Sequence, residues 1–165
     1  MSTFTVSTTY THSVTHVATK MLLTIKEIIR EIGLDPTQFV ADWASYERAI
    51  STWLASRHLQ QVILEVFNPV NGKPVTRWDL DVLYATVGEG TLWVDTAAIR
   101  YAIAKAGFVP STCRYELKIR TSPGSPDVPG WGDCDLRSTE GFRRFGVGAT
   151  IGGTGLTAQT SYWSR

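Results

Sequence analysis

The sequence predicts an α+β domain in which about three helices pack on a mainly antiparallel sheet. Apolar residues in the first third of the chain recur every three or four positions, the period of an amphipathic helix. From residue 61 onward they form continuous or alternating runs separated by Asn-Gly and Gly-rich turns, the pattern of strands and hairpins. With 165 residues the chain can build one core but not two comfortable ones. We therefore expect a single domain over residues 1–165.

The central element is a long helix predicted for residues 13–32. Thr11 or Ser13 can cap its start, and Gly33 is the expected left-handed stop. Residues 1–12, rich in Ser and Thr, precede it as an N-terminal arm or a short edge strand. The helix carries one broad apolar stripe, formed by Val14, Val17, Ala18, Met21, Leu22, Ile25, Ile28, Ile29 and Ile32.

Three elements are predicted next. A second helix over residues 37–57 places its aromatic side chains on one face. Residues 61–67, QVILEVF, form a nearly continuous apolar run that predicts a buried strand. Residues 75–84, VTRWDLDVLY, alternate, and the Asn-Gly pair at 71–72 predicts a hairpin turn between the two strands. In the second strand Val75, Arg77, Asp79 and Asp81 would share one face, and Trp78, Leu80 and Val82 the other.

A third helix over residues 92–106 and a strand over residues 112–121 complete the predicted core, which spans residues 13–121. The strand alternates cleanly, so that Cys113, Tyr115, Leu117 and Ile119 form one face and Arg114, Glu116, Lys118 and Arg120 the other. Its charged residues are spaced as on an exposed sheet edge, where charges discourage promiscuous pairing.

The C-terminal segment, residues 122–165, differs in character from the core. Residues 122–133, SPGSPDVPGWGD, hold three prolines and three glycines, which predicts a long loop. Two short strands are predicted after it, joined by a turn at residues 152–155. Glycine weakens strand interiors and leaves their register poorly specified, so this segment could pair in more than one place.

Composition excludes several classes of function. The formal charge is +1, and no basic run exceeds two residues, which disfavours nucleic-acid binding. No apolar run is long enough to span a membrane, and the N-terminus lacks the charged and apolar regions of a signal peptide. The two cysteines are expected to be free thiols in a reducing compartment, so we expect a cytoplasmic protein.

Two motifs resemble ligand sites but are better explained by structure. His12 and His16 lie four residues apart, yet no acidic residue between them or nearby third ligand supports a metal site. Residues 146–152, GVGATIG, lack the spacing of a dinucleotide loop and the Gly-Lys-Ser/Thr of a phosphate loop. We expect surface histidines and a flexible β-turn, with no metal and no cofactor.

No set of residues predicts catalysis. Cys113 falls on the apolar face of its strand, as an inert core cysteine would. Asp79 and Asp81 could bind a metal or act as acid and base, but alternation places them on a solvated strand face. Asp133 and Asp135 are discounted in the same way. The sequence therefore predicts that the chain is not an enzyme.

The helix and its flanks, THSVTHVATKMLLTIKEIIREIG, resemble the opening helix of the bacterial HORMA domains found in antiphage signalling operons. The order of later elements agrees over residues 10–121, including the hairpin strand RWDLDVLY. This resemblance implies a HORMA-like fold whose C-terminal segment, residues 122–165, acts as a mobile safety belt around a short closure-motif peptide. It also implies a switch: the closed form binds and activates a cGAS/DncV-like nucleotidyltransferase, and an AAA+ remodeller opens it by pulling on the N-terminal arm.

The same resemblance assigns roles to residues of this chain. The peptide would pair with the strand formed by Arg114, Tyr115, Glu116, Leu117, Lys118, Ile119 and Arg120. The belt would use Trp131, Phe142, Phe145, Val147, Ile151, Leu156 and Tyr162. The remodeller would grip Thr3, Phe4, Thr5 and Val6. A second HORMA protein is a further possible partner.

An alternative of a different class stays open at this stage. A structural or assembly protein could use the glycine-rich tail to form oligomers, and the six tryptophans would suit such an interface. Neighbouring genes for a nucleotidyltransferase and an AAA+ ATPase would favour the signalling function over this alternative.

Overall fold

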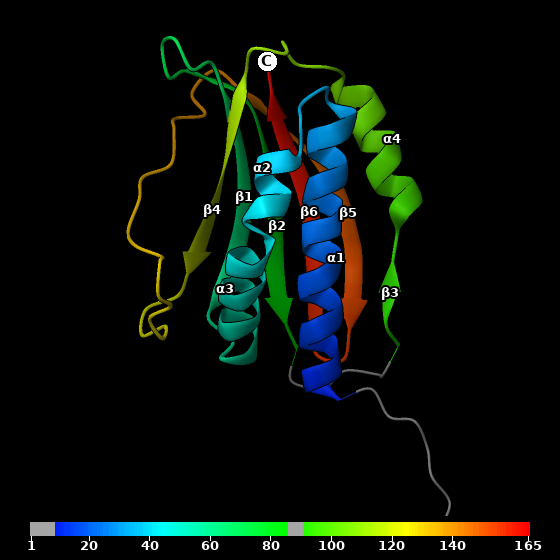
Figure 1. Cartoon of the computed structure of the whole chain (residues 1–165). Helices are drawn as coiled ribbons and strands as arrows, with labels where there is room; N and C mark the ends of the chain where they lie inside the picture. Colours follow the sequence, from blue (N-terminus) through cyan, green and yellow to red (C-terminus); the bar gives the residue numbers. More distant parts are fainter. Residues whose placement is uncertain (1–8, 86–90) are drawn as a thin grey trace, which may run out of the picture.

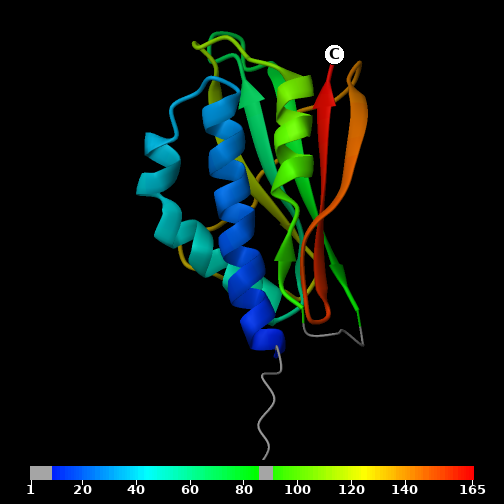
Figure 2. The same cartoon turned by 90° about the vertical axis from the view of Figure 1, so that its right-hand side faces the viewer.

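The computed structural model describes residues 9–85 and 91–165. The predicted remodeller grip at residues 3–6 lies outside them. Helices cover one face of a six-stranded sheet, as Figures 1 and 2 show from two sides. The strand order is β3-β5-β6-β2-β1-β4, and neighbouring strands are antiparallel. The predicted α+β architecture is confirmed.

The elements in chain order are α1 (Tyr10–Glu31), α2 (Thr37–Ala41), α3 (Trp43–Ala55), β1 (Leu59–Phe67), β2 (Pro74–Tyr84), β3 (Trp93–Val94), α4 (Thr96–Ala106), β4 (Arg114–Thr121), β5 (Arg143–Gly153) and β6 (Leu156–Ser164).

Helix α1 lies at the centre of the helical layer. Its apolar stripe is buried as predicted, and Met21, Leu22 and Ile25 are fully inaccessible to solvent. The helix begins earlier than expected because Thr9, not Thr11 or Ser13, accepts the capping hydrogen bond. Gly33 follows its end with a φ of +96°, the left-handed conformation that glycine favours.

The predicted second helix is broken into α2 and α3 at Asp42, whose backbone is not helical. The break lets Phe39 sit fully buried and stack on Tyr46 at a ring separation of 5.2 Å. Tyr115 of β4 fixes the start of α2, because its hydroxyl accepts from the Phe39 backbone N–H and donates to the Asp35 carbonyl. The third predicted helix likewise starts late, at α4, after the short strand β3.

The hairpin β1–β2 forms with its turn at the predicted Asn-Gly pair, and Gly72 has a φ of +69°. The prediction of a solvated strand face at Asp79 is wrong. Asp79 is only 2% exposed, since Arg77 binds both its carboxylate oxygens at 2.7 and 3.0 Å and Trp163 donates an indole N–H at 3.0 Å. A long side chain from the same strand and one from β6 cover the carboxylate, which strand periodicity does not reveal.

The C-terminal hairpin consists of β5 and β6, which have 11 and 9 residues and are longer than the two short strands predicted. The prediction of a flexible β-turn at residues 146–152 is wrong, because these residues belong to β5 and pair with β6. Strand β6 pairs with β2 from Arg77 opposite Trp163 to Tyr84 opposite Leu156. Tyr162 stacks on Trp78 at 4.6 Å and is only 7% exposed. This register buries the apolar face of β6 against α1.

Two glycines of β5, Gly152 and Gly153, are required by the close packing around them. A Cβ on Gly152 would lie 2.3 Å from the indole nitrogen of Trp93, so the β3 side chain needs the space that glycine leaves. A Cβ on Gly153 would lie 2.7 Å from the Ser13 hydroxyl of α1. That hydroxyl accepts a hydrogen bond of 2.6 Å from the backbone N–H of Thr154. The glycines therefore let the hairpin approach β3 and the first turn of α1 closely.

Candidate functional site

Strand β4 is an edge strand of the sheet, as its charge pattern predicts. Within the described residues it pairs with β1 alone and ends the strand order. The backbone groups on its other side are not used by the sheet, so this edge can accept a further strand (Figure 1).

The two faces of β4 differ in chemistry. Leu117 pairs with Leu64 of the core, so Tyr115, Leu117 and Ile119 face the helices. Glu116, Lys118 and Arg120 alternate with them and face away from the helices. The edge therefore presents an apolar side and a charged side.

Residues 122–142, which we call the crossing loop, connect β4 to β5. The loop leaves the end of β4, runs back alongside the open edge, and reaches the far side of the sheet before β5 begins (Figure 1). Two sets of contacts anchor it, one on each face of the sheet.

The first anchor is aromatic and lies on the helical side. Trp131 packs edge-on against Trp53 and Tyr46 of α3, with ring separations of 5.8 and 6.0 Å. The Trp53 indole N–H donates to the Pro126 carbonyl at 2.7 Å, and Val128 is 5% exposed. Burial raises the pKa of Tyr46 to about 12, so its hydroxyl stays neutral. The first half of the crossing loop is thus held by α3.

The second anchor is ionic and lies on the helix-free face. The Arg137 backbone N–H donates to Glu65 at 2.6 Å, and its guanidinium donates to Glu65 at 2.9 Å and to Glu116 at 3.0 Å. The guanidinium also lies 3.7 Å from the centre of the Phe67 ring. Lys118 is 2.5 Å from Glu65 and donates to a backbone carbonyl of the loop. One buried carboxylate therefore holds both the edge strand and the loop.

Glu65 is the centre of this anchor because it is 1% exposed. A buried carboxylate is costly unless it is paired and hydrogen-bonded. Lys118 and Arg137 supply two positive charges, and Arg137 also supplies a backbone donor. If the crossing loop left the sheet, Glu65 would lose half of this compensation, so the ion cluster favours the loop in its present position.

Acid is expected to weaken this anchor at Glu116. A hydrogen bond from Arg137 holds the pKa of Glu116 below its ordinary value of 4.5, although burial opposes the shift. A lowered pKa means that folding favours the carboxylate, so its contribution is present above that ordinary value and is lost as the pH falls through the lowered pKa. In urea titrations at several pH values, Glu116→Gln should therefore lose less stability on acidification than the wild type.

The control for this titration is Glu140→Gln. Glu140 is exposed and makes no ion pair within residues 9–85 and 91–165. The Glu140→Gln variant should keep the pH dependence of the wild type. Identical acid dependence in Glu116→Gln and the wild type would contradict a stabilising ion pair at Glu116.

Between the open edge and the crossing loop lies a channel. It consists of two adjoining cavities of about 670 and 280 Å³, which share Lys118, Ile119, Arg120 and Cys134 in their linings. Trp53, Leu117, Val128 and Trp131 line the helical side, and Asp135 and Leu136 belong to the other side. Because one wall is an unpaired strand edge, the channel suits an extended peptide that would add as a further strand.

Five of the seven predicted peptide-binding residues line this channel, and two do not. Glu116, Leu117, Lys118, Ile119 and Arg120 line it. Arg114 does not, and Tyr115 is instead engaged with α2 and the segment before it.

The predicted belt residues also divide. Trp131 lines the channel, and Phe142 lies at the end of the crossing loop, where Arg165 stacks on its ring at 4.8 Å. The others belong to β5 and β6, strands of the sheet that are separated from β4 by β2 and β1: Phe145, Val147, Ile151, Leu156 and Tyr162.

The prediction from sequence did not include Glu65, Arg137, Trp53 or Cys134. One signal was present, because Glu65 interrupts the apolar run QVILEVF and a buried acid needs a partner. Its partner could not be named from sequence, since Arg137 lies 72 residues away.

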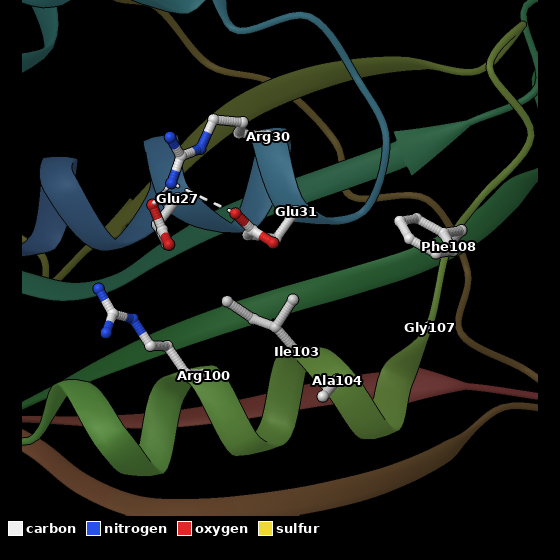
Figure 3. A pocket seen from close by; sticks show the side chains of 8 residues that line it. All are labelled: Glu27, Arg30, Glu31, Arg100, Ile103, Ala104, Gly107 and Phe108. Carbon is white, nitrogen blue, oxygen red and sulfur yellow. Dashed lines mark hydrogen bonds and ion pairs between the residues drawn. The ribbon is translucent and has the colours of Figure 1, made fainter.

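A separate groove of about 560 Å³ lies between α1 and α4 (Figure 3). Arg30 on its α1 side is already paired with Glu27 at 2.6 Å and Glu31 at 3.2 Å. Ile103 of α4 faces into the groove, and the largely exposed ring of Phe108 lies near its end. No nucleophile–base pair lies among its lining residues, so the channel at β4 is the better candidate site.

The described residues contain neither a metal-ligand cluster nor a membrane-spanning helix. Among residues 9–85 and 91–165, no three His, Cys, Asp or Glu side chains gather as a metal site would require. None of the helices in these ranges has the length and apolarity to cross a bilayer. Cys113 and Cys134 are free thiols, and burial raises the pKa of Cys113, whereas Cys134 is exposed.

The fold is that of a HORMA domain. The chain is similar to a chain of the mitotic checkpoint complex, with a TM-score of 0.76, 12% identity, and coverage of 93% of this chain and 98% of that one. It is similar to C. elegans HTP-2 bound to the HIM-3 closure motif, with a TM-score of 0.70, 9% identity, and coverage of 96% and 93%. A chain of the E. coli MS115-1 CdnC:HORMA-deltaN complex gives a TM-score of 0.60, 11% identity, and coverage of 99% and 93%.

The family follows from the sequence itself. The family model described as bacterial HORMA domain 2 matches residues 1–165, so the chain belongs to this family. The resemblance of the opening helix is thereby confirmed. No curated protein matches the chain in sequence.

Proposed function

We propose that this protein is a signalling adaptor that binds a closure-motif peptide along the open edge of β4. One observation carries the proposal: the channel between that edge and a crossing loop anchored on both faces of the sheet. Backbone hydrogen bonds to β4 would supply affinity, and side chains on the two faces would supply specificity. The residues that would contact the peptide are Glu116, Leu117, Lys118, Ile119, Arg120 and Trp131.

The downstream role in the proposal follows the family. The peptide-bound form would bind and activate a cGAS/DncV-like nucleotidyltransferase in antiphage defence, directly or through a second HORMA protein. Support comes from similarity to a HORMA chain in a complex named CdnC:HORMA, and to HTP-2 in a complex with a closure motif. The chain itself would act by binding and not by catalysis, in the cytoplasm.

Opening by an AAA+ remodeller that pulls on the N-terminal arm is also part of the proposal. Ser13, in the first turn of α1, accepts a hydrogen bond from Thr154 in the turn between β5 and β6. Unwinding the start of α1 would break this contact and expose the hairpin turn. The contact supports a mechanical link between the N-terminal arm and the C-terminal hairpin.

Cys134 provides a direct test of peptide binding. It is exposed and lines both cavities of the channel, whereas Cys113 is buried. Maleimide labelling of the full chain, followed by mass mapping, should modify Cys134 first. Peptides tiled from the proteins of neighbouring genes are then added, and one that occupies the channel should slow labelling of Cys134 at least about tenfold, since it removes solvent access.

The control is Cys134→Ser. This variant should lack the fast labelling phase, because its remaining thiol, Cys113, is buried. Limited proteolysis of residues 122–135 with the same peptides gives an independent measurement. If no peptide from any neighbouring gene product protects either Cys134 or the crossing loop, the adaptor proposal is contradicted. The assembly alternative lacks specific support, because the glycine-rich strands are paired within the sheet.

A further inference from the structure

The charges that line the channel divide into two groups. Glu116 and Lys118 belong to the ion cluster around Glu65 and are engaged there. The other group has no ion pair within the described part of the chain. It consists of Asp127, Asp133 and Asp135 on the crossing loop and Arg120 on β4, all of them exposed. The uncommitted lining charges therefore sum to −2.

The positions of Asp133 and Asp135 follow from two contacts between the loop and β4. Lys118 donates to the Asp135 carbonyl at 2.6 Å, which aligns this part of the loop with β4. The Arg137 guanidinium is bound to Glu116, so the loop runs antiparallel to the strand. Asp133, two residues before Asp135, is then level with Arg120. Asp133 and Asp135 thus lie along the charged side of β4, whereas Asp127 lines the part of the channel next to Val128 and Trp131.

The helical half of the channel is apolar. Trp53 and Val128 are 7% and 5% exposed, and the half-buried Leu117 and Trp131 complete this wall. Because successive side chains of a strand point to opposite faces, a peptide on the β4 edge would direct alternate residues to this wall. The residues between them would point to the helix-free half, beside Asp133 and Asp135.

We infer that the peptide taken by this channel alternates large apolar residues with at least one Lys or Arg that pairs with Asp133 and Asp135. This inference rests on the proposed function and specifies its ligand. A cleft with net negative potential favours a cation and rejects a carboxylate. The apolar residues supply the buried area, and the basic residue sets the register.

The test selects peptides without assuming their sequence. A random peptide library is panned against the full-length protein, and recovered peptides are retained only if they slow the labelling of Cys134. Each Lys or Arg of a retained peptide is then replaced by Ser or by Glu. An exposed ion pair contributes up to about fivefold in affinity, so we expect Ser to weaken binding about fivefold and Glu about tenfold or more.

Variants of the protein test the assignment of residues. The double variant Asp133→Asn, Asp135→Asn should abolish the preference for a basic over a neutral peptide. Arg120→Gln should act in the opposite direction and strengthen binding of the basic peptide about twofold to fivefold. Glu140→Gln removes a negative charge outside the channel. It should change neither the preference for a basic peptide nor the affinity for it.

The outcomes of these experiments distinguish the preference for a basic peptide from the proposed function, peptide binding itself. Retained peptides that lack basic residues, or that tolerate Glu at every position, would overturn the inference while leaving peptide binding intact. A basic preference that survives in the Asp133→Asn, Asp135→Asn variant would also overturn it. Recovery of no peptide that protects Cys134 would overturn the proposed function itself.

Discussion

Replacing Arg137 by methionine is expected to make the channel release a bound peptide about thirtyfold faster. The guanidinium and backbone of Arg137 make hydrogen bonds of 2.6 to 3.0 Å to Glu65 and Glu116, and Glu65 is 1% exposed. Methionine keeps an unbranched apolar side chain beside Phe67, but it removes the charge and the guanidinium that lies over the ring. Hydrogen bonds to charged groups contribute about 2 kcal/mol, which is about thirtyfold in an equilibrium. This loss should appear in the dissociation rate, because the anchor closes the channel after the peptide enters.

Peptide release is best measured by competition with an unlabelled peptide after a fluorescent one has bound. The matched control is Arg143→Met, since Arg143 lies six residues along the chain, is exposed, and makes no ion pair within the described residues. The Arg143→Met variant should release peptide at the wild-type rate. An unchanged rate in Arg137→Met, with its fold intact by circular dichroism, would show that the ion cluster does not hold the loop.

A second variant of the same cluster distinguishes charge from contact. Glu65→Gln leaves Arg137 and Lys118 without their buried carboxylate, yet it keeps a group that can accept the backbone hydrogen bond. We expect faster release here also, together with a smaller dependence of the rate on salt than in the wild type. Fast release only in Arg137→Met would point to the guanidinium contacts with Glu116 and the Phe67 ring and not to the buried carboxylate of Glu65.

Replacing Tyr162 by alanine is expected to lower the free energy of unfolding by about 3 to 4 kcal/mol, because truncating a buried aromatic leaves a cavity. Tyr162 is 7% exposed and stacks between Trp78 at 4.6 Å and Phe145 at 5.1 Å. For a domain of this size, such a loss lowers the melting temperature by roughly 10 °C. The ring is also the apolar anchor of the C-terminal hairpin, so detachment of β6 from β2 should precede global unfolding.

Thermal melts give the stability change, and hydrogen exchange of β6 amides detects the detachment. Phe145→Ala is the control, since Phe145 lies opposite Tyr162 on the neighbouring strand β5 but is 39% exposed. This variant should lose less than half as much stability. Equal losses for Tyr162→Ala and Phe145→Ala would contradict the view that Tyr162 is the main apolar anchor. Exchange of β6 amides only on global unfolding would contradict separate detachment of the hairpin.

Local patterns in the sequence determine most of the elements. The three-and-four spacing from Val14 to Ile32 makes α1 a helix with one buried stripe, whatever packs against it. The Asn-Gly pair at 71–72 sets the β1–β2 turn, because glycine adopts the positive φ that this turn requires. Alternation along β4 separates its apolar and charged faces. Each of these features depends on residues a few positions apart, and so it is visible in the sequence.

The candidate site depends on the tertiary structure. Nothing near Glu65 in the sequence indicates that Arg137 and Lys118 will surround it, and Trp131 meets Trp53 only because the crossing loop folds back on α3. Asp79 looks solvated from its strand period but is buried by Arg77 and by Trp163 of β6. Such contacts join residues far apart in the chain, whose pairing is chosen by burial and charge compensation across the whole fold. The sequence by itself therefore determined most of the helices and strands and the family, whereas only the tertiary structure decided where the crossing loop is anchored and where the channel forms.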